Sequence, residues 1–184
     1  MGTVIWPDKR ALWGGRDRRC AILLHQAAGR YRLVGPLILA SRLGDGGLWY
    51  ALMLIIPWLD PVNGLFCTLQ MAVVGAVNVV LYLTVKRRVG RPRPFRACPG
   101  ITACTPALDE FSFPSGHTLH AIAFAVLLSY HYPVVAPAAW LFVALVAVSR
   151  IVLGLHYPSD VAAGALTGIA TGGIAIVLGR LLAI

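Results

Sequence analysis

Long apolar runs, separated by short polar segments, dominate the chain. The run 64–85 contains no charged residue, and 161–178 is a second uninterrupted run. A helix needs about 20 residues to cross the hydrocarbon core of a bilayer. Both runs are therefore predicted to span a membrane. A shorter apolar run, 46–59, ends at the turn signal 60–63 and is predicted to be a further crossing.

The stretch 115–149 contains no Asp, Glu, Lys or Arg. It is too long for one crossing and just long enough for two. Tyr130, His131, Tyr132 and Pro133 interrupt it near the middle, and proline is tolerated in the first turn of a helix. The stretch is predicted to form a tight helical hairpin, which brings the expected number of spans to five or six.

The N-terminal segment 1–45 has a different pattern. Two short apolar stretches, 21–28 and 33–40, are separated by Arg30 and Arg32. An arginine at the centre of a bilayer costs about 2.5–3.5 kcal/mol. The segment is therefore predicted to form amphipathic helices that lie in the membrane interface rather than cross it.

The composition also indicates a membrane protein. The chain is 58% hydrophobic and only 12% charged, with a mean hydropathy of +0.76, whereas about a quarter of the residues of a soluble domain are charged. The formal net charge is +9. Because the arginines gather at the ends of apolar runs, anionic headgroups or a phosphate substrate are favoured over nucleic acid as partners. We expect a single domain, 1–184, with an all-α, polytopic transmembrane helical bundle, an interfacial segment 1–45 and an extramembrane loop 86–114.

A glycine stripe marks the last predicted span. Gly164, Gly168 and Gly172 recur there at four-residue spacing. Small residues at this spacing let another membrane helix approach closely. We expect the stripe to pack against a helix of the same chain.

The predicted crossings place three unusual segments on one membrane face. The span 64–85 ends where the loop 86–114 begins, and the loop stays on that face. The hairpin 115–149 crosses and returns, so that the segment 149–160 emerges beside the loop. The chemistry-bearing residues of the chain are concentrated on these segments.

The first segment is the basic run 86–94. Such a run at the end of a span is ordinarily a flank that favours the cytoplasmic side. Pro92 and Pro94 stiffen this one, which suits cations held at fixed positions. Arginine offers a planar fork for phosphate oxygens, and lysine offers a point charge.

The second segment is Ser115-Gly116-His117, at the mouth of an apolar helix. Serine is a good N-cap, and the first turn of a helix presents backbone N–H groups that attract anions. Gly116 lets a phosphate approach the backbone closely. His117 is a candidate acid at this position.

The third segment carries Arg150, His156 and Asp160. Pro158 suits the first turn of the last helix, which places Asp160 at about the third helical position. From there its carboxylate is expected to hydrogen-bond to His156, fix the imidazole tautomer and leave the other ring nitrogen as a nucleophile. The remaining histidines are interpreted as packed or interfacial residues: His25, His120 and His131.

Together, the three segments resemble the signature of the type 2 phosphatidic acid phosphatase superfamily, which also includes vanadium haloperoxidases and glucose-6-phosphatases. All signature positions are filled in order between residues 86 and 160. They are Lys86 with Arg93-Pro94, then Pro114-Ser115-Gly116-His117, then Ser149-Arg150 with His156 and Asp160.

The resemblance implies a role for each position. His156 is the implied nucleophile, Asp160 its orienting partner, and His117 the acid that protonates the leaving oxygen. The implied phosphate-binding residues are Lys86, Arg93, Ser115, Gly116 and Arg150. The implied reaction is hydrolysis of a lipid phosphate ester or pyrophosphate through a phosphohistidine.

No metal or other cofactor is expected. A two-metal phosphatase needs several carboxylate or histidine ligands. The three segments offer one carboxylate, Asp160. Asp109 and Glu110 in the loop are too few to complete the ligand set of a metal ion. The substrate is expected to reach the site sideways from the bilayer, with Phe111 and Phe113 either lining that path or anchoring the loop at the interface.

The resemblance also implies a location. The family fold is a helical bundle with its site near one membrane face, in bacteria usually the periplasmic or exterior face of the inner membrane. Cys98 and Cys104 share the loop, and an oxidising compartment favours a disulfide between them; two free thiols are the alternative.

Three other functions use the same residues: a lipid phosphotransferase, a haloperoxidase, and a non-enzymatic membrane protein that retains the fold. The signature identifies a phosphate and not the group attached to it. Undecaprenyl pyrophosphate, phosphatidylglycerol phosphate, phosphatidic acid and lipid A phosphate are all candidate substrates.

Overall fold

The computed structural model describes residues 15–30 and 32–182, so residues 1–14 of the predicted interfacial segment lie outside the described part. The predicted all-α fold is confirmed. In chain order the elements are α1 (Gly15–Arg30), α2 (Val34–Leu43), α3 (Gly47–Leu59), α4 (Asn63–Val89), α5 (Pro94–Ala97), α6 (Gly116–His131), the 3-10 helix η2 (Pro133–Val135), α7 (Ala136–Val152) and α8 (Pro158–Leu182).

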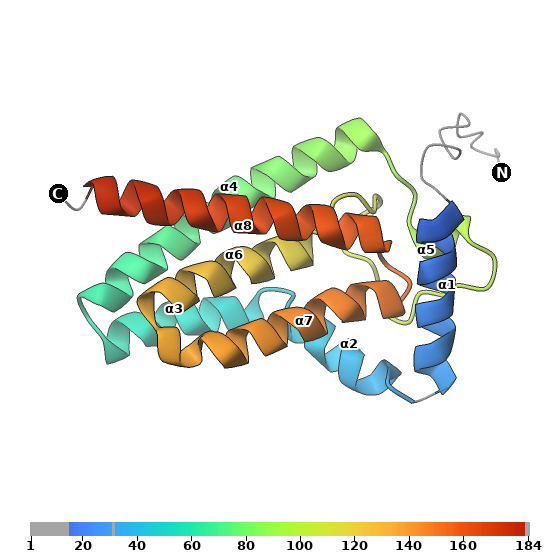
Figure 1. The fold of residues 1–184 in the computed structure, drawn as a ribbon, viewed down its shortest axis with the longest axis horizontal. Coiled ribbons are helices and arrows are strands. Elements are labelled where there is room, and N and C mark those ends of the chain that lie inside the picture. The colour runs from blue at the N-terminus through green and yellow to red at the C-terminus, as the bar shows by residue number, and fades with distance from the viewer. Residues whose placement is uncertain (1–14, 31, 183–184) are drawn as a thin grey trace.

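The long helices form a bundle, and α1 lies across one end of it. Figure 1 shows α3, α4, α6, α7 and α8 running along the length of the molecule, whereas α1 stands nearly perpendicular to them beside the loop that follows α4. An interfacial helix is expected to have this orientation. The predicted hairpin is also confirmed, because α6 ends at His131 and the chain resumes at Pro133.

The outer surface of the bundle is apolar. Among residues 15–30 and 32–182, three stretches are long and apolar enough to cross a membrane: α4, α8 and the stretch 133–152. Their outward side chains are exposed, for example Leu166 at 70%, Val80 at 66% and Leu141 at 65%. A soluble protein rarely exposes contiguous apolar surface on this scale. The chain is therefore an integral membrane protein.

The core lies between α3, α4, α6 and α7. Trp49, Met71, Phe124 and Val146 are buried there in one cluster. The rings of Trp49 and Phe124 meet edge to face, with centroids 5.2 Å apart, a favourable geometry for aromatic pairs. This cluster fixes the helices that carry the polar residues described below.

The glycine stripe of α8 packs against α6, as predicted. A Cβ added at Gly164 would lie 2.6 Å from the carbonyl oxygen of Ser115, and one added at Gly168 would lie 2.5 Å from that of Leu119. A Cβ added at Gly172 would lie 3.0 Å from the carbonyl oxygen of Ala123, also on α6. Only glycine allows this approach, which brings the beginnings of α6 and α8 together.

Replacing Gly168 by alanine is expected to destabilise the protein, because the added methyl group overlaps the α6 backbone. Overpacking of this kind costs about 1–3 kcal/mol. Gly173 provides a matched control on the same helix, since a Cβ there meets nothing within 4 Å. Thermal unfolding in detergent is expected to show a lower Tm for Gly168→Ala and an unchanged or higher Tm for Gly173→Ala. Equal Tm values for the two variants would contradict the packing described here.

Candidate active site

A cavity of about 540 Å³ is lined by residues of α3, α4, α6 and α7 and of the loops that join them. The cavity brings together six of the eight predicted site residues: Lys86, Arg93, Gly116, His117, Arg150 and His156. The other two, Ser115 and Asp160, are fully buried. The three segments that were predicted to share one membrane face therefore meet around one space.

The carboxylate of Asp109 holds Lys86 and Arg93. Lys86 Nζ donates to both Asp109 oxygens, at 2.8 and 2.7 Å, and Arg93 Nη2 donates to Oδ1 at 2.9 Å. Burial raises the pKa of Asp109, but the hydrogen bonds and charges of Lys86 and Arg93 outweigh burial and hold the pKa below its ordinary value. The ionised carboxylate thus fixes two cations at one side of the cavity and neutralises part of their charge.

Arg150 is held differently. It is 2% exposed, and its Nη1 donates to Ser41 Oγ of α2. Within the described ranges its Nε has no hydrogen-bond partner, and none of the ion pairs found there includes Arg150. A buried cation without a counter-ion is costly. Arg150 is therefore the cation of this cavity that is best placed to receive a phosphate.

His156 lies in a tight turn between α7 and α8. The N–H groups of Leu155 and His156 donate to the carbonyl oxygen of Arg150, at 3.1 and 3.0 Å. Gly154 has a φ of 74°, and a Cβ there would lie 2.6 Å from Ile101 Cγ2, so the turn requires glycine. This turn fixes His156 relative to the end of α7 that carries Arg150.

The imidazole of His156 is neutral, with a lone pair on Nε2. Arg93 Nη1 lies 3.2 Å from Nε2, and since arginine only donates, Nε2 accepts and the ring proton is on Nδ1. Burial, followed by the positive charges of Arg93 and Arg150, holds the pKa of His156 well below its ordinary value. A nucleophilic histidine needs this protonation state.

Asp160 is the third residue of α8, which begins at Pro158 as predicted. Its Oδ2 accepts the N–H of Tyr157 at 2.8 Å and lies 3.5 Å from His156 Nδ1, beyond the usual range of a hydrogen bond. The predicted direct hydrogen bond to His156 is therefore not made in this structure, because Oδ2 turns toward the backbone of Tyr157. His156 Nδ1 has no other partner within residues 15–30 and 32–182, so Asp160 remains the group placed to orient it.

Ser115 precedes α6 as predicted, but its side chain makes no capping hydrogen bond to the backbone. Ser115 occupies the N-cap position, and its N–H donates to the carbonyl oxygen of Asp160 at 3.0 Å. Its Oγ pairs with Thr118 Oγ1 at 3.0 Å, and the residues that line the cavity include Gly116 but not Ser115. A phosphate contact by the Ser115 hydroxyl stays a prediction.

Sequence reasoning missed Asp45, in the turn between α2 and α3. Its Oδ1 accepts a hydrogen bond from His117 Nε2. This hydrogen bond is the main reason why the pKa of Asp45 lies below its ordinary value. A carboxylate at this position orients the imidazole of His117, the predicted proton donor. One signal was available, since Asp45 is the only acidic residue between Asp17 and Asp60.

Arg91 was also outside the predicted set, although it belongs to the basic run. Its Nη1 donates to Asp160 Oδ1 at 2.5 Å, and its guanidinium lies over the Tyr157 ring, 3.9 Å from the centroid. Arg91 therefore holds the second oxygen of the carboxylate next to His156.

The other half of the cavity is apolar. Its walls are formed by residues of α3 and α4: Trp49, Tyr50, Met53, Met71, Ala72, Gly75, Ala76 and Val79. Ala72 and Ala76 are exposed at the surface, so this half borders the lipid-facing side of α4. Neither Phe111 nor Phe113 lines this cavity, and Phe111 forms an isolated backbone bridge with Pro92; whether the two residues border the substrate path or anchor the loop stays open.

The cysteine pair predicted to form a disulfide is not bonded. Cys98 and Cys104 are both free thiols in the structure. Cys98 is buried, with its Sγ 3.5 Å from the Tyr157 hydroxyl, whereas the Cys104 Sγ lies 3.9 Å from the carbonyl oxygen of Thr102. The disulfide prediction is wrong here, because the packing directs the two thiols to different partners.

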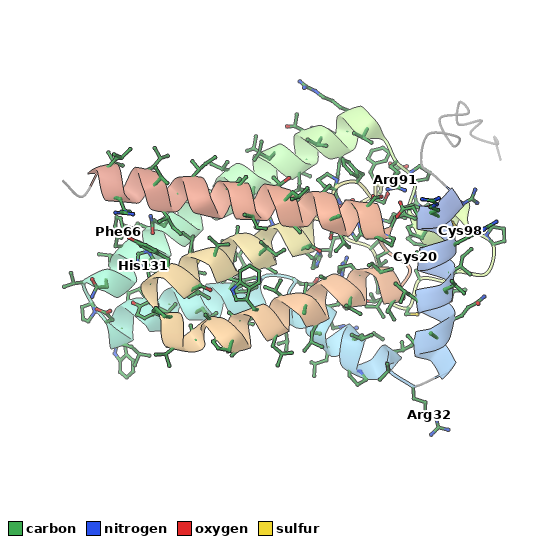
Figure 2. The ribbon with its side chains drawn as sticks, viewed as in Figure 1. Cys20, Arg32, Phe66, Arg91, Cys98 and His131 are labelled. Atoms are coloured by element: carbon green, nitrogen blue, oxygen red, sulfur yellow. The ribbon has the colours of Figure 1, made fainter. Side chains whose placement is uncertain are left out.

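The histidines interpreted as packed residues have structural partners. His131 lies at the end of the bundle opposite Arg91 (Figure 2), with its Nε2 2.6 Å from Gln70 Oε1. His120 lines the cavity, but its two ring nitrogens lie 2.8 and 3.2 Å from the carbonyl oxygens of Gly116 and Gly75.

Two curated relatives share part of this sequence. The decaprenylphosphoryl-5-phosphoribose phosphatase of Mycolicibacterium smegmatis is 44% identical over 82 residues, which cover 45% of this chain and 43% of that protein. The undecaprenyl-diphosphatase BcrC of Bacillus subtilis is 32% identical over 113 residues, which cover 61% of this chain and 58% of that protein. The matches thus span about half the length of these relatives.

The fold and the family pattern match over more of the chain. The crystal structure of Aquifex aeolicus LpxE superimposes with a TM-score of 0.76 and 25% identity, covering 86% of this chain and 93% of that one. The sequence profile of the PAP2 superfamily matches residues 64–181. That range contains every predicted site residue, from Lys86 to Asp160, and the chain therefore belongs to the PAP2 superfamily.

Proposed function

We propose that this protein hydrolyses a lipid phosphate ester or pyrophosphate through a phosphohistidine on His156. The environment of Arg150 is the main observation in support of this proposal. Its buried guanidinium, without a carboxylate partner in the described part of the chain, lines the same cavity as the neutral His156. An anion with several oxygens is the ligand that such an arrangement favours.

In the first step, the phosphoryl oxygens bind Lys86, Arg93 and Arg150, and Arg93 moves its Nη1 from the His156 lone pair to the phosphate. Nε2 then attacks phosphorus in line, and the P–O bond to the leaving group breaks as the N–P bond forms. The electron pair of the broken bond stays on the leaving oxygen, which takes a proton from His117.

In the second step, water attacks the phosphohistidine. His117, now neutral, takes a proton from the water, and the N–P bond breaks with its electron pair returning to Nε2. Asp160 stabilises the charge that the His156 ring carries in the intermediate, and Asp45 stabilises the charge on His117. Orthophosphate leaves, and both histidines regain their starting states.

The carboxylates near the cavity are poor candidates for a metal site. Asp109 is neutralised by Lys86 and Arg93, and Asp160 is neutralised by Arg91. A divalent cation would have to displace these ion pairs to reach oxygen ligands. The proposed reaction is therefore metal-independent.

A polyprenyl lipid is the proposed substrate class. The apolar half of the cavity, between α3 and α4, offers a lipid tail a path from the bilayer to the cations. The two relatives described above are named for decaprenylphosphoryl and undecaprenyl substrates. We further propose that the chain is one phosphatase domain of a bacterial inner membrane, with this site facing the periplasm or the exterior.

The test is phosphate release by purified protein in detergent with EDTA present. Undecaprenyl pyrophosphate is expected to be hydrolysed faster than phosphatidylglycerol phosphate, phosphatidic acid and lipid A phosphate, since its tail is a single chain. In water labelled with heavy oxygen, the label is expected in the released phosphate. Transfer of an unlabelled phosphoryl group to a lipid or sugar would identify a phosphotransferase instead. Activity that is lost in EDTA and restored by Mg²⁺ would contradict the mechanism.

A further inference from the structure

The interfacial helix α1 contributes a carboxylate to the network behind His156. Asp17 Oδ2 accepts hydrogen bonds from Arg91 Nη2 at 2.6 Å and from Ser159 Oγ at 2.5 Å. Its Oδ1 accepts the backbone N–H of Ser159, in the first turn of α8, at 3.1 Å. The Asp17 side chain is only 14% exposed, so these contacts are largely shielded from water.

Arg91 connects this carboxylate to the one beside the nucleophile. Its Nη2 binds Asp17 and its Nη1 binds Asp160, while its flat face lies over Tyr157. The guanidinium fork is thus fixed on two edges and one face. Its orientation sets that of the Asp160 carboxylate, whose other oxygen lies 3.5 Å from His156 Nδ1.

We propose that Asp17 is a positioning residue for catalysis, which acts through Arg91 and Asp160 on His156. This inference rests on the function proposed above. It extends the catalytic unit to α1, which lies outside the 64–181 region shared with the PAP2 superfamily. Since α1 lies across the end of the bundle (Figure 1), the docking of an interfacial helix is linked to the reactivity of the nucleophile.

The charge of Asp17 matters because Arg91 is shared between two carboxylates. With Asp17 ionised, Asp160 neutralises only part of the guanidinium charge and keeps negative potential at His156 Nδ1. Without the Asp17 charge, Arg91 pairs with Asp160 alone, and the carboxylate is drawn toward Arg91 and away from the imidazole. The positive ring of the phosphohistidine is then less stabilised.

Other contacts hold α1 in place independently of this network. Arg18 Nη2 donates to the carbonyl oxygen of Ala97 at 2.9 Å, and His25 Nδ1 lies 2.8 Å from that of Val152. Arg18 is adjacent to Asp17 on the same helix and contacts neither Arg91 nor Asp160 through these bonds. Arg18→Gln is therefore a matched control that removes one contact of α1 with the loop while leaving the Asp17 contacts and the His25 contact in place.

The test compares steady-state hydrolysis of undecaprenyl pyrophosphate in detergent. Asp17→Asn, which keeps the size of the side chain, is expected to lower kcat by about 10–100-fold with KM unchanged, the range found when carboxylates that orient metal-bound histidines are removed. Arg18→Gln is expected to retain kcat. The double variant Asp17→Asn/Arg91→Gln is expected to lose no more than Arg91→Gln alone, since the two residues act in series.

A second measurement needs no turnover. The rate at which diethyl pyrocarbonate modifies His156, relative to His131 in the same sample, is read by peptide mass spectrometry. Asp17→Asn is expected to slow this modification, and Arg18→Gln is not. An unchanged kcat in Asp17→Asn overturns the inference. Equal losses of kcat in Asp17→Asn and Arg18→Gln also overturn it. If the wild-type protein hydrolyses no lipid phosphate, the proposed function fails, and the modification rate alone decides the role of Asp17.

Discussion

Replacing His156 by alanine is expected to lower kcat/KM for lipid phosphate hydrolysis by about 10⁴-fold or more, as the loss of the nucleophile does in other hydrolases with covalent intermediates. The variant retains Arg150, Lys86 and Arg93, so it is expected to bind substrate while losing turnover. Phosphate release from undecaprenyl pyrophosphate by purified protein measures the effect.

His131→Ala is the matched control, because His131 lies at the other end of the bundle from Arg91 (Figure 2). This control is expected to keep full activity. Quenching the wild-type reaction in alkali, in which phosphohistidine survives, is expected to trap phosphate on His156. Normal hydrolysis by His156→Ala would remove the nucleophile assignment and the mechanism built on it.

The residues that line the cavity could be predicted from the sequence because they lie at the ends of helices. Lys86 lies in the last turn of α4, Gly116 begins α6, and Arg150 lies in the last turn of α7. The order of apolar runs along the chain predicted that these helix ends lie on the same membrane face. The glycine stripe then predicted how closely α6 and α8 approach, and this approach joins Ser115 to the carbonyl oxygen of Asp160.

The partners of these residues were less predictable, because they come from distant parts of the chain. Asp45 precedes His117 by 72 residues, and Asp17 precedes Arg91 by 74. No local periodicity relates positions so far apart. Only the packing of α1 and of the α2–α3 turn against the bundle brings these carboxylates to the site.

The contacts of the loop residues were also hard to predict, because they are made with distant parts of the chain. The cysteine pair was inferred from closeness in sequence, but the buried Cys98 packs in a small cluster with Ala21, Ile101 and Tyr157. For Phe111 the aromatic character left two roles open, and the backbone contact that the structure shows, from Lys86 Nζ to its carbonyl oxygen at 3.1 Å, was not predicted. Tertiary contacts, rather than composition, decide where side chains of an irregular loop point.

Replacing Arg150 by methionine is expected to lower kcat/KM by about 10³-fold or more, the effect of removing an arginine that stabilises a phosphoryl transition state. Lys86 and Arg93 are not expected to compensate, because Asp109 already neutralises part of their charge. Arg88→Met is the matched control: Arg88 is exposed in the last turn of α4 and does not line the cavity. It is expected to retain activity.

The stability of the same variant separates a binding role from a structural one. Arg150 is a buried cation that lacks a carboxylate partner within the described residues, and an apolar side chain of similar volume avoids the desolvation cost of such a charge. Arg150→Met is therefore expected to keep or raise the Tm in detergent while it loses activity. Inorganic phosphate, which is expected to raise the Tm of the wild-type protein by binding in the cavity, is expected to have little effect on the variant. A large fall in Tm with retained phosphate stabilisation would show that Arg150 supports the bundle rather than the substrate.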